Sequence, residues 1–199
     1  EAIAVTYLAK ALNTLGAELS LLSMNTTKHP FDITTLPETF NHYKSITLVD
    51  IDNRVKVLDA FLNLFSNKSY HIERFISPEF DDQLKNILQN NEFDIIHLET
   101  LYLAPYIQTI RKYSNAKIAM RSHNVEHEIW KRIAENAGIG AKKLYLQLLS
   151  KRLETFEVVS LNSYDIMVAI TQRDLDFFKS LGLKIPAIVA PIGLDLDDY

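Results

Sequence analysis

Apolar positions recur along the chain with two alternating periods. Near the amino terminus Ala4, Leu8, Ala11 and Leu15 share one helical face, and Gly16 ends the predicted helix. Six later runs are short and apolar at successive positions, as in parallel strands that helices cover on both faces. We predict these strands at residues 18–24, 44–49, 93–98, 117–122, 166–171 and 187–192.

Helical patterns lie between these strands. We predict helices at residues 78–89, 104–113, 125–136, 141–161 and 173–181, and a further helix in the apolar stretch "VKVLDAFLNLF" (55–65), packed at an edge or over the site. Repeated alternation of strands and helices indicates an α/β fold with a Rossmann-like, doubly wound, mostly parallel sheet. We therefore expect a single domain over residues 1–199, with its strands together in one sheet.

The chain opens inside a helical pattern, without a Met, a signal peptide or a strand ahead of it. A doubly wound domain begins with a strand, so we expect a piece of a longer protein that carries a seventh strand before Glu1. Ligands of open parallel sheets bind outside the carboxyl ends of the strands. The residues just after each strand are therefore the candidates for function.

Composition narrows the function classes. The formal net charge of −4 gives no support to bulk nucleic-acid binding. The absence of cysteine excludes a disulfide framework and cysteine-ligated metal sites. No apolar run reaches the length of a membrane span. We expect a cytoplasmic protein, with peripheral contact at the inner membrane face left open.

The stretch "RSHNVEHE" contains "HNVEH" (123–127), which matches the H-x-x-E-H signature of one class of zinc peptidases. Zinc binding by two such histidines requires both on one face of a helix. Here a predicted strand leads directly into the motif, so a helix boundary separates His123 from His127. A third ligand from Glu154 or Glu157 would belong to no recognisable motif. We therefore disfavour a zinc site.

The same residues can instead begin a helix. Asn124 suits the N-cap position, and Glu126 and Glu128 would lie in the first turn, where the helix dipole favours acids. His123 differs, because an imidazole at the carboxyl edge of a central strand faces the ligand crevice and can change charge near neutral pH. We take His123 as the candidate catalytic residue. For His97, inside an apolar strand, a core position and a site position both remain open.

Three stretches of the second half stand in a distinctive order. They are "FDIIHLET" (93–100), "MRSHNVEHEIWKR" (120–132), and "LETFEVVSLNSYDIMVAITQRDLDFFKSLGL" (153–183) followed by "PIGLDLDDY" (191–199). Together they resemble the amino-terminal, acceptor-side domain of GT-B glycosyltransferases of the family-4 type. The first stretch resembles that family's h-D-h-I-H-x-H strand, with Glu99 where a second histidine is common. The opening helix resembles the helix after the family's glycine-rich first loop.

The resemblance implies roles for individual residues. His123 would approach the donor sugar and the reacting centre. The substrate-binding residues that it implies are Glu99, Tyr102, Arg121, Asn124, Glu126, Thr171, Arg173 and Gly193. With Thr171 and Arg173, Gln172 would occupy the turn that faces the cleft. Glu99 and Tyr102 would contact the acceptor, and Gly193 would belong to an interdomain junction with Pro191, Ile192 and Asp195.

The resemblance also implies an activity. It points to a retaining glycosyltransferase of polysaccharide biosynthesis, which passes a sugar from a nucleotide-sugar donor to a glycan or lipid-linked acceptor, with no cofactor and no bound metal. A second Rossmann domain that holds most of the nucleotide would follow Tyr199, so these residues alone would be inactive. A noncatalytic Rossmann-like binding or regulatory domain is the alternative, because fold does not determine function.

One basic helix face raises a separate question. The helix predicted at 141–161 carries Lys142, Lys143, Lys151 and Arg152, and these side chains are most simply solvated. In a glycolipid transferase such a face would also suit contact with an anionic membrane.

Overall fold

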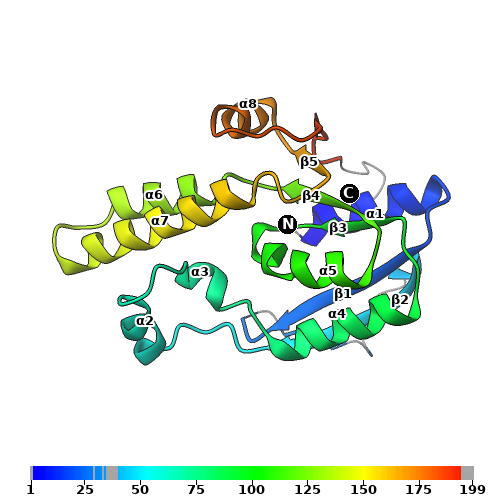
Figure 1. The fold of residues 1–199 in the computed structure, drawn as a ribbon, viewed down its shortest axis with the longest axis horizontal. Helices are drawn as coiled ribbons and strands as arrows, with labels where there is room; N and C mark the ends of the chain where they lie inside the picture. The colour runs from blue at the N-terminus through cyan, green and yellow to red at the C-terminus, as the bar shows by residue number, and fades with distance from the viewer. Residues whose placement is uncertain (1, 29, 33, 35–39, 194–199) are drawn as a thin grey trace. The chain divides into compact units, whose positions relative to one another are not determined.

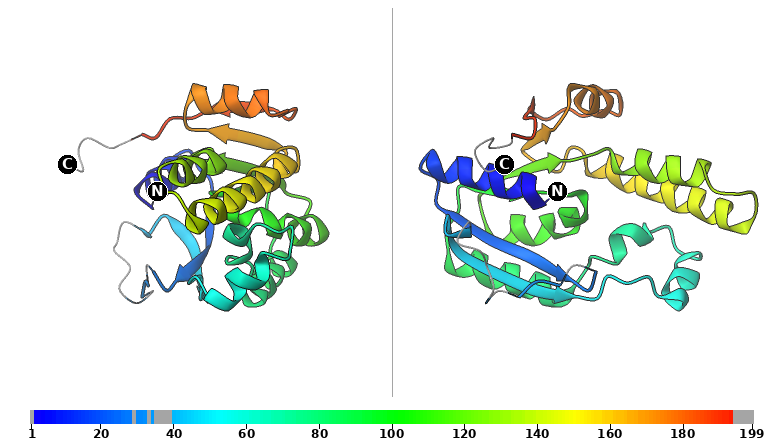
Figure 2. Two further views of the ribbon diagram at one scale, coloured as in Figure 1. Left: turned by 90° about the vertical axis from the view of Figure 1, so that its left-hand side faces the viewer. Right: turned by 180° about the vertical axis from the view of Figure 1, so that it is seen from behind.

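All six predicted strands are present, and every strand pair is parallel (Figures 1 and 2). The structure is a computed structural model and describes residues 2–28, 30–32, 34 and 40–193. Within these residues the strands are β1 (Leu19–Thr26), β2 (Tyr43–Ile51), β3 (Ile95–Leu98), β4 (Lys117–Ser122), β5 (Ile166–Ala169) and β6 (Ala187–Val189). The predicted α/β fold with parallel pairing is confirmed.

The expectation of one sheet is wrong. β1 and β2 form a two-stranded sheet, whereas β3, β4, β5 and β6 follow one another in a four-stranded sheet. The alternation of strands and helices predicts each strand but not which strands pair. In the part of the chain that the structure describes, no ladder joins the two groups.

The chain divides into two compact units, and the prediction of one domain stays a prediction. Unit 1 comprises Glu1–Arg54 with Pro191–Tyr199, and unit 2 comprises Val55–Ala190. In unit 1, α1 (Ala2–Thr14) precedes the β1–β2 pair. Gly16 has a φ of 94°, which only glycine adopts without strain, and this confirms it as the residue that ends the helix.

Unit 2 holds the remaining helices. They are α2 (Val57–Asn63), α3 (Tyr70–Glu73), α4 (Pro78–Asn90), the 3₁₀ helix η3 (Leu101–Tyr106), α5 (Ile107–Tyr113), α6 (Glu126–Glu135), α7 (Ala141–Ser160) and α8 (Gln172–Ser180). The sequence predicted all of them except α3, which is too short to show a helical period. The helix predicted at 104–113 begins as η3, because Pro105 supplies no N–H for an α-helical turn.

The core of unit 2 forms where helices cover the four-stranded sheet. In α4, Ser77 accepts a hydrogen bond from the backbone N–H of Phe80, which starts the helix, and Phe80, Leu84 and Leu88 are buried at four-residue spacing. The largest fully buried side chains are Phe178, Ile110, Ile118, Leu153 and Leu161, which come from helices on both sides of β4 in sequence and from β4 itself. α6 and α7 lie side by side as a long hairpin (Figure 1).

One core side chain carries a titratable group without a hydrogen-bond partner. His71 in α3 is buried, and its ring lies 3.8 Å from the Trp130 ring between centroids. Among the described residues, neither ring nitrogen has a hydrogen-bond partner. Burial, with a smaller contribution from the charge of Arg74, lowers the pKa of His71 to about 4. His71 is therefore neutral in the folded protein at neutral pH.

We predict that His71 makes the protein acid-sensitive. The unfolded chain binds the proton at a pKa of 6.5 and the folded chain only at about 4, so stability present above pH 6.5 is lost as the pH falls through this window. Between about pH 7 and about pH 5 the loss from this group is on the order of 2 kcal/mol. Urea unfolding of the wild type and of His71→Phe, which keeps a ring against Trp130, measures it. An equal loss in both proteins would contradict the assignment.

Candidate functional site

The register of β3 on β4 brings four polar side chains to one sheet edge. His97 pairs with Ala119 and Leu98 with Met120. Because side chains on one face of a strand recur at every second residue, His97 and Glu99 lie on the same face as Ala119, Arg121 and His123. The carboxyl ends of the two strands thus place Glu99 beside Arg121 and His123. This edge is where open parallel sheets bind ligands.

Glu99 is the centre of this cluster. Its Oε2 lies 2.8 Å from His123 Nε2 and 3.4 Å from Arg121 Nη1, and its Oε1 lies 3.2 Å from His97 Nε2. The last contact is close but lacks hydrogen-bond geometry. Burial acts to raise the pKa of Glu99, but contacts from His123 and His97 and the charge of Arg121 outweigh it and lower the pKa to about 2. The carboxylate is therefore ionised.

The ionised carboxylate sets the chemistry of His123. A carboxylate only accepts hydrogen bonds, so Nε2 of His123 must carry the proton and donate it to Glu99. In the neutral ring, Nδ1 is then an acceptor. The His123 side chain is 8% exposed and Arg121 only 3%, whereas Glu99 is 23% exposed. The cluster is thus shielded from bulk water, so its charges interact more strongly than they would in water, but it remains open at Glu99.

Two further residues of the predicted site form a second pair. The Tyr102 hydroxyl donates a hydrogen bond of 3.1 Å to Glu126 Oε2, and the Tyr102 ring lies against Phe75 with 4.5 Å between centroids. Burial first, and then the charge of Glu126, raises the pKa of Tyr102 above its ordinary value. The phenol therefore stays protonated and fixes the Glu126 carboxylate at the start of α6.

Two predicted residues after β5 have contacts that hold helices. Thr171 is the N-cap of α8: its Oγ1 accepts from the backbone N–H of Asp174 and donates to the Asp174 carboxylate at 2.7 Å. Arg173 pairs with Glu128 of α6 at 2.7 Å while its side chain stays largely exposed. Arg173 therefore joins α8 to α6 and still faces solvent.

The expectation that Asn124 caps α6 is wrong. The N-cap is Val125, which offers no side-chain acceptor, and the Asn124 backbone carbonyl accepts from Ser122 Oγ. Glu157 of α7 does the capping instead, since its buried carboxylate accepts from the backbone N–H groups of Glu126 and His127, both at 3.1 Å. A carboxylate at this position also suits the helix dipole.

The two histidines of the H-x-x-E-H stretch have different partners, as the sequence predicted from the helix boundary between them. His123 follows β4 and contacts Glu99, whereas His127 lies in α6 and its Nδ1 is 2.6 Å from Glu157 Oε2. In the part of the chain that the structure describes, no three histidine or carboxylate side chains gather as metal ligands would. His127 is thus part of the cap of α6.

Sequence reasoning weighed Glu157 only as a zinc ligand. Its position in α7 held a signal for the other role, because Glu157 is four residues after Leu153 and eight after Leu149, both buried. A carboxylate on the apolar face of a helix needs a buried partner. The identity of that partner, 30 residues away, is not readable from spacing.

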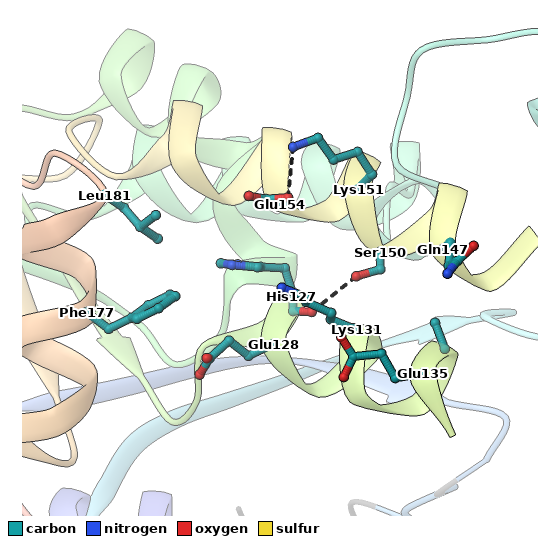
Figure 3. A pocket seen from close by; sticks show the side chains of 11 residues that line it. His127, Glu128, Lys131, Glu135, Gln147, Ser150, Lys151, Glu154, Phe177 and Leu181 are labelled. Atoms are coloured by element: carbon teal, nitrogen blue, oxygen red, sulfur yellow. Dashed lines mark hydrogen bonds and ion pairs between the residues drawn. The ribbon is translucent and has the colours of Figure 1, made fainter. Parts of the chain in front are cut away.

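An open cavity of about 400 Å³ lies between α6, α7 and α8 (Figure 3). Phe177 and Leu181 line one side, and the remaining lining includes five charged side chains: Glu128, Lys131, Glu135, Lys151 and Glu154. The carboxylates in this lining outnumber the lysines, which disfavours an anion as the ligand. None of the residues predicted for the functional site lines this cavity.

The predicted junction residues belong to unit 1. Gly193 has no positive φ, and a Cβ there would meet no atom of the described residues within 4 Å. Among the residues that the structure describes, nothing therefore requires glycine at this position. Pro191 and Ile192 follow β6, and Asp195 lies outside the described residues.

We predict that Glu157 stabilises unit 2 and that its neighbour Glu154 does not. Glu157→Ala removes a buried acceptor of two N–H groups and the partner of His127, which should lower the free energy of unfolding by about 3 kcal/mol. Glu154→Ala on the same helix breaks only a surface ion pair with Lys151, worth about 0.5 kcal/mol. Urea unfolding of both variants checks this, and equal effects would rule out the capping role.

The sequence was also compared with known proteins. No family model matches it. No curated protein matches it significantly. The fold and the cluster around Glu99 are therefore the basis for any functional conclusion.

Proposed function

We propose that this chain supplies the acceptor-side half of the cleft of a retaining glycosyltransferase that uses a nucleotide-sugar donor. The observation that supports it is the cluster of His123, Glu99 and Arg121 at the carboxyl edge of a parallel sheet. That edge is the ligand-binding edge of such folds. The resemblance of the sequence to GT-B transferases of the family-4 type points to the same residues.

In this proposal His123 positions the sugar that is transferred. Its Nε2 is engaged by Glu99, so Nδ1 remains to accept a hydrogen bond from a sugar hydroxyl. Glu99 holds the ring orientation, and the contacts of Glu99 with His123 and His97, together with the charge of Arg121, keep Glu99 ionised. The ring is already oriented before the substrate binds, and such preorganisation in a shielded site is the usual source of electrostatic stabilisation in enzymes.

The second pair would serve the acceptor. Tyr102 and Glu126 offer a phenol and a carboxylate at the start of α6, and both hydrogen-bond readily with the hydroxyl groups of a glycan or the glycan part of a lipid-linked acceptor. Arg173 adds an exposed cation beside Glu128. In the proposal these groups bind the acceptor, and a second domain binds the nucleotide.

The proposal predicts that His123→Ala, in the whole protein, lowers turnover far more than nucleotide affinity. Loss of one positioned hydrogen bond that strengthens in the transition state costs on the order of 10²–10³ in rate. Nucleotide affinity should change little, because His123 would meet only the transferred sugar. Rates of sugar transfer and nucleotide binding, measured beside thermal unfolding, test this.

His127→Ala is the matched control, since it removes the other histidine of the same motif. It leaves the buried Glu157 without its partner and should lower stability by about 3 kcal/mol, while the folded fraction keeps its turnover. A folded His123→Ala protein with wild-type turnover would refute the site assignment. Loss of activity in His127→Ala at full stability would also contradict it.

A further inference from the structure

α2 exposes its large apolar side chains and buries a polar one. Its large apolar side chains, followed by one just beyond its end, are Val57, Leu58, Phe61, Leu62 and Phe65, and their exposed fractions lie between 55% and 85%. The spacing places these five on one helical face, which we name the apolar platform. The buried residue of α2 is the polar Asn63. The helix predicted here is confirmed, but its apolar face is exposed within the described part of unit 2.

Polar contacts fix the platform at both ends. Before α2, the buried Tyr70 hydroxyl donates to the Lys56 carbonyl at 3.1 Å and accepts from the Lys56 N–H at 3.0 Å. After it, Arg152 of α7 donates to the Asn63 carbonyl and side-chain oxygens at 2.8 and 2.9 Å, and to the Leu64 carbonyl at 3.1 Å. The expectation that Arg152 is simply solvated is wrong. These contacts hold α2 in place while its apolar face stays exposed.

A second apolar tip projects at the same end of unit 2. The turn between α6 and α7 carries Ile139, which is fully exposed, and Leu144 follows it with 69% exposure. Figures 1 and 2 show this turn and α2 directed toward the same end of the unit. Two separate apolar projections suit a broad, yielding surface better than a single narrow groove.

Lysines outnumber carboxylates in the two segments that carry these apolar groups. The segments 55–68 and 136–144 hold four lysines, Lys56, Lys68, Lys142 and Lys143, and a single carboxylate, Asp59, in a chain with a net charge of −4. Lys68 also pairs with Glu73 just outside. Large apolar side chains flanked by lysines are the pattern of elements that lie in the interface of an anionic bilayer. A second copy of the chain fits this surface less well, because the lysines of one copy would face the lysines of the other.

We propose that the apolar platform and the α6–α7 turn dock unit 2 on an anionic lipid bilayer. The contact is peripheral: none of the helices in the described part of the chain is long and apolar enough to cross a membrane. Val57, Leu58, Phe61, Leu62 and Phe65 enter the boundary between headgroups and acyl chains, and the lysines meet the lipid phosphates. The proposal is independent of glycosyl transfer, since it concerns binding to lipid alone.

Vesicle co-sedimentation of the 199-residue chain tests the docking. The wild type should bind vesicles of equal parts phosphatidylglycerol and phosphatidylcholine, and bind pure phosphatidylcholine vesicles weakly. Phe65→Ser should weaken binding about tenfold, by the apolar area that it withdraws. Lys142→Gln with Lys143→Gln should weaken it about twenty-fivefold on anionic vesicles, at about fivefold for each lysine.

Val159→Ser is the matched control. Val159 of α7 is 75% exposed, close to the 80% of Phe65, but lies at the other end of that helix. This variant should bind as the wild type does, and circular dichroism should show all variants folded. Absence of wild-type binding to anionic vesicles, or equal binding by Phe65→Ser and Val159→Ser, would overturn the proposal. So would self-association in sedimentation velocity that Phe65→Ser abolishes, because the platform would then join two copies.

Discussion

The ionised carboxylate of Glu99 is the interaction on which the candidate site depends. Parallel register between β3 and β4 sets Glu99 beside Arg121 and His123, and the charge of Arg121 helps to keep Glu99 ionised despite burial. An ionised Glu99 in turn fixes which nitrogen of His123 carries the proton. Without it, His123 would have no defined orientation and the strand edge no organised donor or acceptor.

A second buried carboxylate holds the element that follows. Glu157 caps α6 from α7 and engages His127, so the short connection from β4 to α6 is anchored at both ends, by Glu99 before it and Glu157 after it. Two histidines only four residues apart thus have separate tasks. In the proposed function His123 would meet a ligand at the sheet edge, whereas His127 belongs to the framework that holds the start of α6.

The sequence predicted elements well because their signals are local. Apolar runs marked all six strands, and Gly16 marked the end of α1. The helix boundary between His123 and His127 also followed from the local pattern. Contacts between residues far apart in the sequence were not predictable, because only the fold brings such residues together. Examples are Glu157 with His127 and Arg152 with Asn63.

The wrong predictions also arise where contacts between distant residues outweigh local signals. Asn124 is a good N-cap by type, but a distant carboxylate took over its task, so local propensity lost to a buried tertiary contact. The single sheet was expected from the alternation of strands and helices, which predicts each strand but not which strands pair. α2 was expected to pack because it is apolar, whereas the structure turns its polar Asn63 inward to meet Arg152.

The tautomer of His123 shows whether an ionised Glu99 orients the His123 ring. Nitrogen NMR of the histidine-labelled chain distinguishes protonation at Nε2 from protonation at Nδ1 for each ring. An ionised Glu99 at 2.8 Å predicts that the neutral His123 ring carries its proton on Nε2, and that Glu99→Gln weakens this preference. A neutral His123 ring protonated on Nδ1 would contradict the account, because Glu99 would then not hold the ring and Nδ1 would not be free to accept from a sugar.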